Sequence, residues 1–363
     1  MLYYLLLPFN EQVPGLGVIR YITFRTAAAS LTAFVLSIAL GPWLIKRLRA
    51  FQIGQVVRSD GPTSHRPKAG TPTMGGLLIL AAVFAPTLLW ANLANVYIWV
   101  ALGATAAFGA IGFADDYLKV TRHSHYGLYA RYKLLAQIVV GLAVGVTLIL
   151  LAAHDPPLYS TRLIFPFFKR LIPDLGWGYV PFAALVLVCA SNGVNLTDGL
   201  DGLAISTFAV SAATFTALAY VTGHRVFADY LLLVHFEPIG ELTIFCGALV
   251  GASLGFLWWN AHPAEIFMGD VGSLGLGGAL GTVAILTKQE LLLPIVGGVF
   301  VMETLSVIIQ VASFKLTGRR VFRMAPIHHH FELAGWAEPK VITRFLILAI
   351  LCALFSLTTL KLR

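Results

Sequence analysis

The chain has 363 residues, of which 58% are apolar and only 12% are charged, about half the charged fraction that is usual in soluble domains. With a mean hydropathy of +0.82, this composition indicates an integral membrane protein rather than a soluble one. The net charge of +8 can be explained by orientation in a membrane, so we do not expect nucleic-acid binding.

Ten apolar runs are long enough to predict ten transmembrane helices. In chain order they cover residues 22–45, 75–92, 97–117, 133–153, 180–195, 202–221, 240–259, 273–287, 290–314 and 341–361. The eighth is short and rich in glycine, which makes it the weakest of the ten. No polar stretch between them exceeds roughly thirty residues, too few for a separate soluble domain. We therefore expect an all-α integral membrane protein with a single polytopic domain, residues 1–363.

The distribution of lysine and arginine predicts how the chain crosses the membrane. Sixteen of the 25 basic residues fall in one alternating set of loops, within 46–68, 119–133 and 315–344. Basic loops stay on the cytoplasmic side, so this set should be cytoplasmic and both termini periplasmic. The segment 154–179 should lie on the outer face as an amphipathic hairpin or an interfacial piece.

The most polar stretch between two apolar runs is 191–204, which holds two asparagines, two aspartates and three glycines. Asp198 and Asp201 are three residues apart and share a face if a helix begins here. The glycines allow backbone N–H groups to approach a phosphate closely. A simpler interpretation is a short loop in which one of these aspartates caps the next helix. We set it aside because other carboxylates fall on the same side of the membrane.

Three further polar motifs end or follow apolar runs on that side. They are Asp115-Asp116, Asn260 with the 267–270 run that ends in Asp270, and the histidines at 328–330. Hard oxygen donors without paired cysteines suit Mg²⁺. The histidines leave zinc open as an alternative, although three consecutive side chains cannot easily face one ion, which favours phosphate contact or substrate positioning. The motifs together predict a Mg²⁺ and acid–base cluster in a cytoplasmic cleft.

A glycine-rich segment before the second predicted helix is typical of phosphate binding. Lys68 supplies a mobile positive charge, and Thr73 and the backbone amides of Gly75 and Gly76 lie at a helix N-terminus, where the helix dipole favours anions. We expect these groups to face the carboxylates.

One carboxylate falls inside an apolar run. Glu303 lies near the middle of the ninth run, with Ser306 and Gln310 on the same helical face. A lone carboxylate in the membrane costs about 2.5 to 3.5 kcal/mol on insertion scales, so this face should line a cavity or a helix contact. Whether its role is structural or functional stays open.

Five motifs together resemble the phospho-N-acetylmuramoyl-pentapeptide transferase family of the polyprenyl-phosphate N-acetylhexosamine-1-phosphate transferase superfamily. The matching segments are 60–76, 115–119, 195–202, 267–273 and 324–332. One departure lies between 119 and 131, where Arg122, His123 and His125 stand in place of additional lysines.

The resemblance implies a homodimer with ten membrane helices in the bacterial cytoplasmic membrane, a cytoplasmic active site and dependence on Mg²⁺. It also implies the reaction, in which UDP-N-acetylmuramoyl-pentapeptide and undecaprenyl phosphate give lipid I and UMP. The alternative is the sister reaction, in which UDP-N-acetylglucosamine donates N-acetylglucosamine-1-phosphate to a polyprenyl phosphate.

By matching motif, Asp270 would be the principal Mg²⁺ ligand, with Asp198 and Asp115 as further ligands and Asp116 beside them. The implied catalytic residues are Asp115, Asp116, Asp198, Asp270 and His329. Uridine would stack on Phe267. The implied substrate-binding residues are Lys68, Thr73, Lys119, Asn192, Asn195, Gly199, Leu200, Asp201, Asn260, Phe267, Gln310, His328 and His330.

The residues suit this chemistry independently of the resemblance. A phosphate oxygen of the lipid must attack the β-phosphate of a UDP-sugar, which requires two anions to be held together and charge on UMP to be neutralised. Asp115 is our choice for the base, and a two-step route through a carboxylate nucleophile remains open. A transporter would place its charges near the midplane rather than at helix ends.

Overall fold

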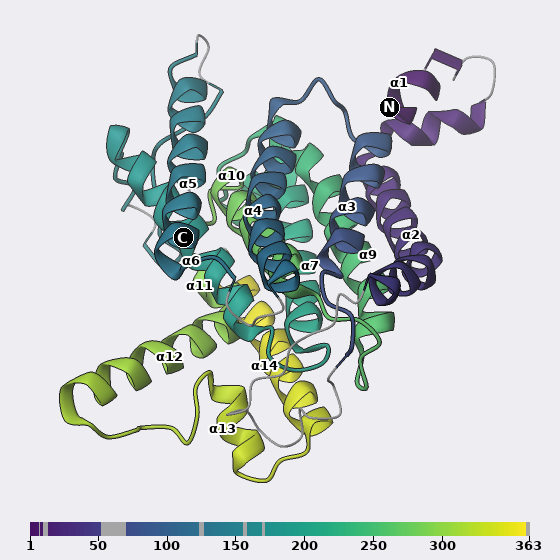
Figure 1. Ribbon diagram of the computed structural model, residues 1–363. Helices are drawn as coiled ribbons and strands as arrows, with labels where there is room; N and C mark the ends of the chain where they lie inside the picture. The colour runs from purple at the N-terminus through teal and green to yellow at the C-terminus, as the bar shows by residue number, and fades with distance from the viewer. Residues whose placement is uncertain are drawn as a thin grey trace.

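The structure is a computed structural model that describes residues 1–6, 8–9, 14–51, 70–122, 127–154, 158–168 and 171–360. Within these parts the chain forms helices and no extended strand (Figure 1). The predicted all-α class is therefore confirmed.

Ten helices correspond one by one to the ten predicted membrane spans. They are α2 (Ile22–Ala50), α3 (Gly76–Trp90), α4 (Val96–Thr121), α5 (Ala130–Ala152), α6 (Tyr179–Thr197), α7 (Leu203–Gly223), α9 (Leu242–Asn260), α10 (Gly269–Leu286), α12 (Gly298–Thr317) and α14 (Glu338–Thr358). Nine helices in the described residues are long and apolar enough to cross a membrane, and α3 is a shorter apolar helix of 15 residues.

Shorter helices connect these spans. They are α1 (Leu2–Leu6), α8 (Arg225–Leu231), α11 (Leu293–Val296), α13 (Ile327–Leu333) and the 3₁₀ turns η2 (Pro14–Arg20), η4 (Gly176–Gly178) and η5 (Glu237–Glu241). The predicted ninth span, 290–314, is wrong at its start, because α11 ends before Gly297 and α12 begins only at Gly298. A Cβ on Gly298 would lie against the Cys352 side chain of α14, so the chain turns where two helices meet closely.

The weakest predicted span, α10, is the most deeply buried of the nine candidate spans in the described chain. Its glycines let neighbouring backbones approach. A Cβ on Gly277 would lie 2.6 Å from the carbonyl oxygen of Ala190 in α6, and one on Gly76 of α3 would lie 2.7 Å from the carbonyl carbon of Val271. Small residues allow this close packing between membrane helices, where apolar burial gives little preference between protein and lipid. The glycine content that weakens the hydropathy of α10 thus places it at the centre of the bundle.

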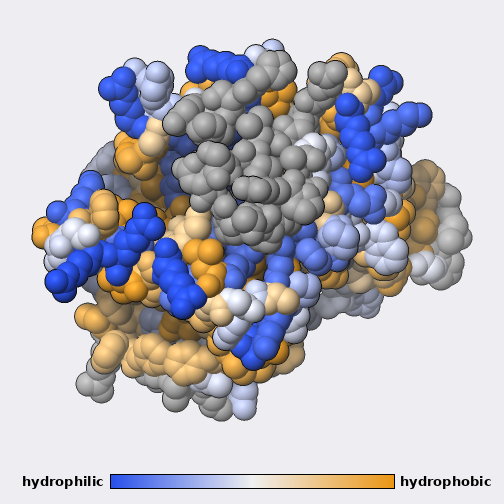
Figure 2. Space-filling view, turned by 60° about the horizontal axis from the view of Figure 1, so that its bottom comes forward, coloured by the Kyte–Doolittle hydropathy of each residue, from blue (hydrophilic) through white to orange (hydrophobic). Residues whose placement is uncertain are grey.

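The helices at the edge of the bundle expose large apolar side chains. Helix α12 reaches away from the other helices in Figure 1. The exposed apolar residues of α5, α12 and α14 include Leu135, Val139, Leu150, Leu305, Ile308, Phe314, Leu351, Leu354 and Phe355. Such surfaces match the hydrocarbon of a bilayer. Figure 2 brings forward the face with α13 and the start of α14, where hydrophilic residues gather.

A buried ion pair lies at the other end of the bundle. Arg25 of α2 and Glu241 of η5 form this pair, and Glu241 Oε1 also accepts a hydrogen bond from the Asn92 amide at 2.6 Å.

The predicted hairpin in 154–179 is confirmed in its described part, where the Leu163 amide donates to the Pro173 carbonyl at 2.9 Å.

Candidate active site

Three carboxylates from two helices meet at one end of the bundle. Asp115 and Asp116 lie near the end of α4 and are 3% exposed, and Asp270 is the second residue of α10. One oxygen from each lies within 4.8 Å of the others. The approach depends on Gly112, because a Cβ there would lie 2.6 Å from the Val271 nitrogen and closer still to the Asp270 carbonyl.

Two lysines supply positive charge to this group of carboxylates. The Lys119 Nζ lies 2.6 Å from Asp115 Oδ2, 2.8 Å from Asp270 Oδ2 and 3.5 Å from Asp116 Oδ1. Lys133 Nζ, on α5, lies 2.7 Å from Asp270 Oδ2. Our sequence analysis counted Lys133 only as a basic loop residue, because nothing local in the sequence links it to a carboxylate 137 positions away.

The carboxylates fit a divalent cation. All the converging ligands are oxygens, which Mg²⁺ prefers, and an ammonium group already lies between the three side chains. The resemblance implied a ligand set with Asp198, but the oxygens that converge within 4.8 Å belong to Asp115, Asp116 and Asp270.

Backbone amides and one asparagine orient these carboxylates. The amides of Leu128 and Val271 donate to Asp115 Oδ1 at 2.6 Å and to Asp116 Oδ2 at 3.1 Å. Asn195 of α6 donates through Nδ2 to Asp270 Oδ1 at 2.7 Å. Each aspartate therefore keeps one oxygen engaged by a hydrogen bond while the other faces Lys119.

Asp198 follows α6 directly and lies outside the membrane-spanning helices. Burial, together with the negative charges of Asp270 and Asp116, raises the pKa of Asp198 to about 8. Asp198 therefore lies close enough to Asp270 and Asp116 for their charges to affect its protonation.

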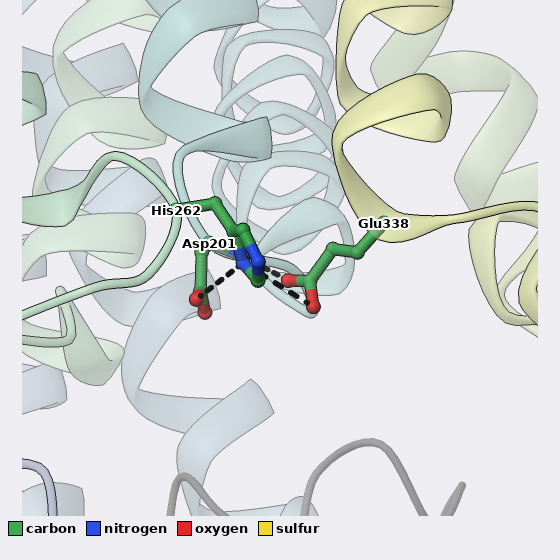
Figure 3. A group of neighbouring side chains, drawn as sticks. All are labelled: Asp201, His262 and Glu338. Atoms are coloured by element: carbon green, nitrogen blue, oxygen red, sulfur yellow. Dashed lines mark hydrogen bonds and ion pairs between the residues drawn. The ribbon is translucent and has the colours of Figure 1, made fainter.

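The turn between α6 and α7 is held at several points, and Figure 3 shows the contacts among Asp201, His262 and Glu338. The Asp201 amide donates to Glu338 Oε1 at 2.9 Å, and Asp201 Oδ2 accepts from the Ala264 amide at 3.1 Å. His262 Nδ1 lies 3.2 Å from Asp201 Oδ2 and 3.6 Å from Glu338 Oε2. Gly202, at φ 76°, donates its amide to Asn260 Oδ1 at 3.0 Å. We call residues 198–202 the clamped turn, because these contacts hold its backbone.

His262 and Glu338 were missed by sequence reasoning. They lie 61 and 137 positions from Asp201, and no spacing rule joins them. The side chains of the predicted substrate residues Asp201 and Asn260 hold backbone groups in place. Asp201 Oδ2 accepts from the Ala264 amide, and Asn260 Nδ2 donates to the Ile266 carbonyl at 2.8 Å.

The expectation for the amides before the second span is wrong. The Gly75 amide donates to the Phe267 carbonyl at 2.9 Å, and the Gly76 amide donates to the Met268 carbonyl at 2.8 Å. The two N–H groups at this helix start thus donate to carbonyls of the chain before α10 and do not face a phosphate.

The other two predicted phosphate contacts differ from each other. Lys68 lies outside the described residues. Thr73 lies near the carboxylates, because a Cβ on Gly269 would lie 3.0 Å from the Thr73 hydroxyl.

The predicted substrate residues are spread around this end of the bundle. Phe267 is half-buried and lies in the connection between α9 and α10. Leu200, in the clamped turn, is buried at 4% exposure. Asn192 donates through Nδ2 to Gln137 Oε1 of α5 at 2.8 Å. Gln310 of α12 accepts from the Phe322 amide at 2.9 Å and so orders the connection to α13.

The three histidines of α13 have different surroundings. His328 is fully buried, His329 Nδ1 lies 2.7 Å from Glu332 Oε2, and His330 Nδ1 accepts from the Arg323 amide at 3.1 Å. In this arrangement they do not converge as three ligands of one zinc ion.

Comparisons with known proteins identify the family of this chain. Residues 98–288 match the model of glycosyl transferase family 4, and residues 68–80 match phospho-N-acetylmuramoyl-pentapeptide-transferase signature 1. The chain is 60% identical over 365 residues to the phospho-N-acetylmuramoyl-pentapeptide-transferase of Desulfatibacillum aliphaticivorans, covering 100% of both chains. It is 57% identical over 361 residues to the protein of that name from Koribacter versatilis, covering 95% of both. On these grounds the chain belongs to the phospho-N-acetylmuramoyl-pentapeptide-transferase family.

Proposed function

We propose that this protein transfers phospho-N-acetylmuramoyl-pentapeptide from its UDP conjugate to undecaprenyl phosphate, which forms lipid I and releases UMP. The observation that carries the proposal is the group of three carboxylates and two lysines at one end of a membrane bundle, in a chain similar over its full length to transferases of that name. The bilayer would supply the lipid acceptor.

The reaction makes one P–O bond and breaks another. An oxygen of the lipid phosphate attacks the β-phosphorus of the UDP-sugar, and the bond from that phosphorus to the bridging oxygen breaks, so that UMP leaves with the electron pair. Lys119 and Lys133 reduce the repulsion between the two anions. Asp115 removes the remaining proton of the lipid phosphate. In the alternative two-step route, a carboxylate would first take the sugar phosphate.

Asp115, Asp116 and Asp270 would hold Mg²⁺, with Asp198 beside them. When bound, the ion neutralises charge on the diphosphate and on the departing UMP. Asn195 keeps Asp270 oriented for this task through its 2.7 Å hydrogen bond.

Uridine would stack on Phe267 and contact the backbone of Gly199 and Leu200 in the clamped turn. Asn260 and Glu338 hold the amides of this turn, so they fix the shape of the surface that the nucleotide meets. We assign the donor diphosphate to Lys119, and the sugar and peptide to Gln310, His329 and His330, because the His328 ring is fully buried.

The orientation is also part of the proposal. The carboxylate end of the bundle would face the cytoplasm, where the basic loops predict it to be, and both termini would be periplasmic. We further propose that the protein acts as a homodimer.

The test uses purified protein with undecaprenyl phosphate and, separately, UDP-N-acetylmuramoyl-pentapeptide or UDP-N-acetylglucosamine. We expect Mg²⁺-dependent UMP release with the first donor only, and EDTA should abolish it. Asp270→Asn should lower kcat by about 100-fold or more, whereas Asp229→Asn, which changes an exposed carboxylate of α8, should not. Turnover of UDP-N-acetylglucosamine alone would instead identify the sister reaction.

A further inference from the structure

Glu303 is a buried carboxylate to which neither the family match nor the proposed chemistry gives a role. It lies in the first half of α12 and is 0% exposed. Within the described chain, no well-aligned hydrogen bond reaches either of its oxygens, and His328 Nδ1 lies 3.1 Å from Oε2. Because burying a carboxylate is costly unless it is paired, the imidazole of His328 is the partner that makes this position tolerable.

His328 carries this contact from α12 to the clamped turn. Its ring is also 0% exposed. A Cβ on Gly199 would lie 2.7 Å from His328 Cε1 and closer still to Nε2, so the ring edge opposite Glu303 presses on the Gly199 backbone. An imidazole presents its two nitrogens on different edges, and the carboxylate at Nδ1 therefore fixes which edge faces Gly199.

The other anchors of the clamped turn lie on different residues. Glu338 and Asn260 hold the amides of Asp201 and Gly202, at the end of the turn nearer α7. Gly199 lies at the opposite end of the turn. The His328 ring packs on it, and the polar partner of that ring is Glu303. Loss of the carboxylate would free the ring to turn and would release the backbone at Gly199 and Leu200.

We propose that Glu303 is a positioning residue for the nucleotide of the donor substrate. It holds His328 against Gly199 and thereby sets the backbone that the uridine meets, without contacting the substrate itself. The inference rests on the proposed function, because it takes the clamped turn as part of the uridine site.

The experiment measures the Kd of UMP and the KM of each substrate for purified variants. Glu303→Ala should raise the UMP Kd and the KM of the UDP-sugar by about tenfold, the size expected when a buried polar group loses its partner. The KM of undecaprenyl phosphate should stay unchanged. Glu303→Gln keeps an oxygen near Nδ1 and should recover most of the affinity, and Glu303→Asp should be intermediate.

Glu290→Ala is the matched control. It removes another buried carboxylate, 2% exposed and paired with Lys288 at 3.0 Å, just beyond the end of α10 farthest from Asp270. It should lower the melting temperature without changing the UMP Kd. Gly199→Ala presses on the ring from the other side, so it should weaken UMP binding, and its effect should be less than additive with that of Glu303→Ala.

The outcomes separate this inference from the proposed function. If Glu303→Ala lowers the melting temperature but leaves the UMP Kd and donor KM unchanged, Glu303 is only structural and the inference is wrong. If Glu303→Ala does not fold, Glu303→Asp decides by the same criterion. If the unmodified protein binds UMP but does not use UDP-N-acetylmuramoyl-pentapeptide, the proposed function fails while UMP binding still tests Glu303.

Discussion

The contact between α4 and α10 at Gly112 provides the sharpest test of the site geometry. A Cβ at this position would lie 2.6 Å from the Val271 nitrogen, whereas ordinary contact begins at 3.4 Å. Gly112→Ala therefore requires the start of α10 to move by more than 0.8 Å, the difference between 3.4 and 2.6 Å, because the Asp270 carbonyl lies closer still. Because the clash is with backbone, no rotamer change can relieve it.

The movement separates Asp270 from Asp115 and Asp116. A misplacement of about 1 Å at a reacting centre costs on the order of 100-fold in rate, and overpacking a core costs about 1–3 kcal/mol of stability. We expect Gly112→Ala to lose about 100-fold in kcat, to need more Mg²⁺ for half-maximal activity, and to melt at a lower temperature.

Gly103→Ala is the control on the same helix. A Cβ there meets nothing within 4 Å, so this variant should keep its activity and gain about 1 kcal/mol of helix propensity. UMP release across a Mg²⁺ titration and thermal melting in detergent measure both variants. If Gly112→Ala matched Gly103→Ala in kcat, Mg²⁺ requirement and melting temperature, the argument that backbone contact places Asp270 would be refuted.

Three further predictions test the proposed chemistry, the fold and the orientation. Asp115→Asn should lower kcat most near pH 6 and less as the pH rises, because the lipid phosphate, with a second pKa of about 6, then loses its proton unaided; an equal loss at every pH in initial-rate assays would exclude Asp115 as the base. Arg25→Ala leaves Glu241 buried without its cation, so it should destabilise the fold by about 3–5 kcal/mol while the kcat of folded protein is unchanged, and an unaltered melting curve would contradict this. Cysteines introduced at His329 and Leu158 should react from opposite sides, with an impermeant maleimide labelling only the Leu158 position in intact cells; labelling of both would overturn the topology.

The sequence alone was enough to predict the class of protein, ten apolar helices with one wrong boundary, and the gathering of the carboxylates at one end of the bundle. These properties are local, since hydropathy over about 20 residues identifies a span and the alternation of spans assigns each motif to one side. Asp115, Asp116 and Asp270 could therefore be grouped before their contacts were known.

Only the tertiary structure decided which groups share the site. Lys133, His262 and Glu338 reach it from parts of the chain far from the residues that they contact, and the amides of Gly75 and Gly76 are used by carbonyls of residues 267–268. Such contacts depend on where glycines allow two helix backbones to approach, which no pattern within one helix records. The pairing of Glu303 with His328 belongs to the same class, because the sequence shows that a buried carboxylate needs a partner, but only helix packing selects which residue it is.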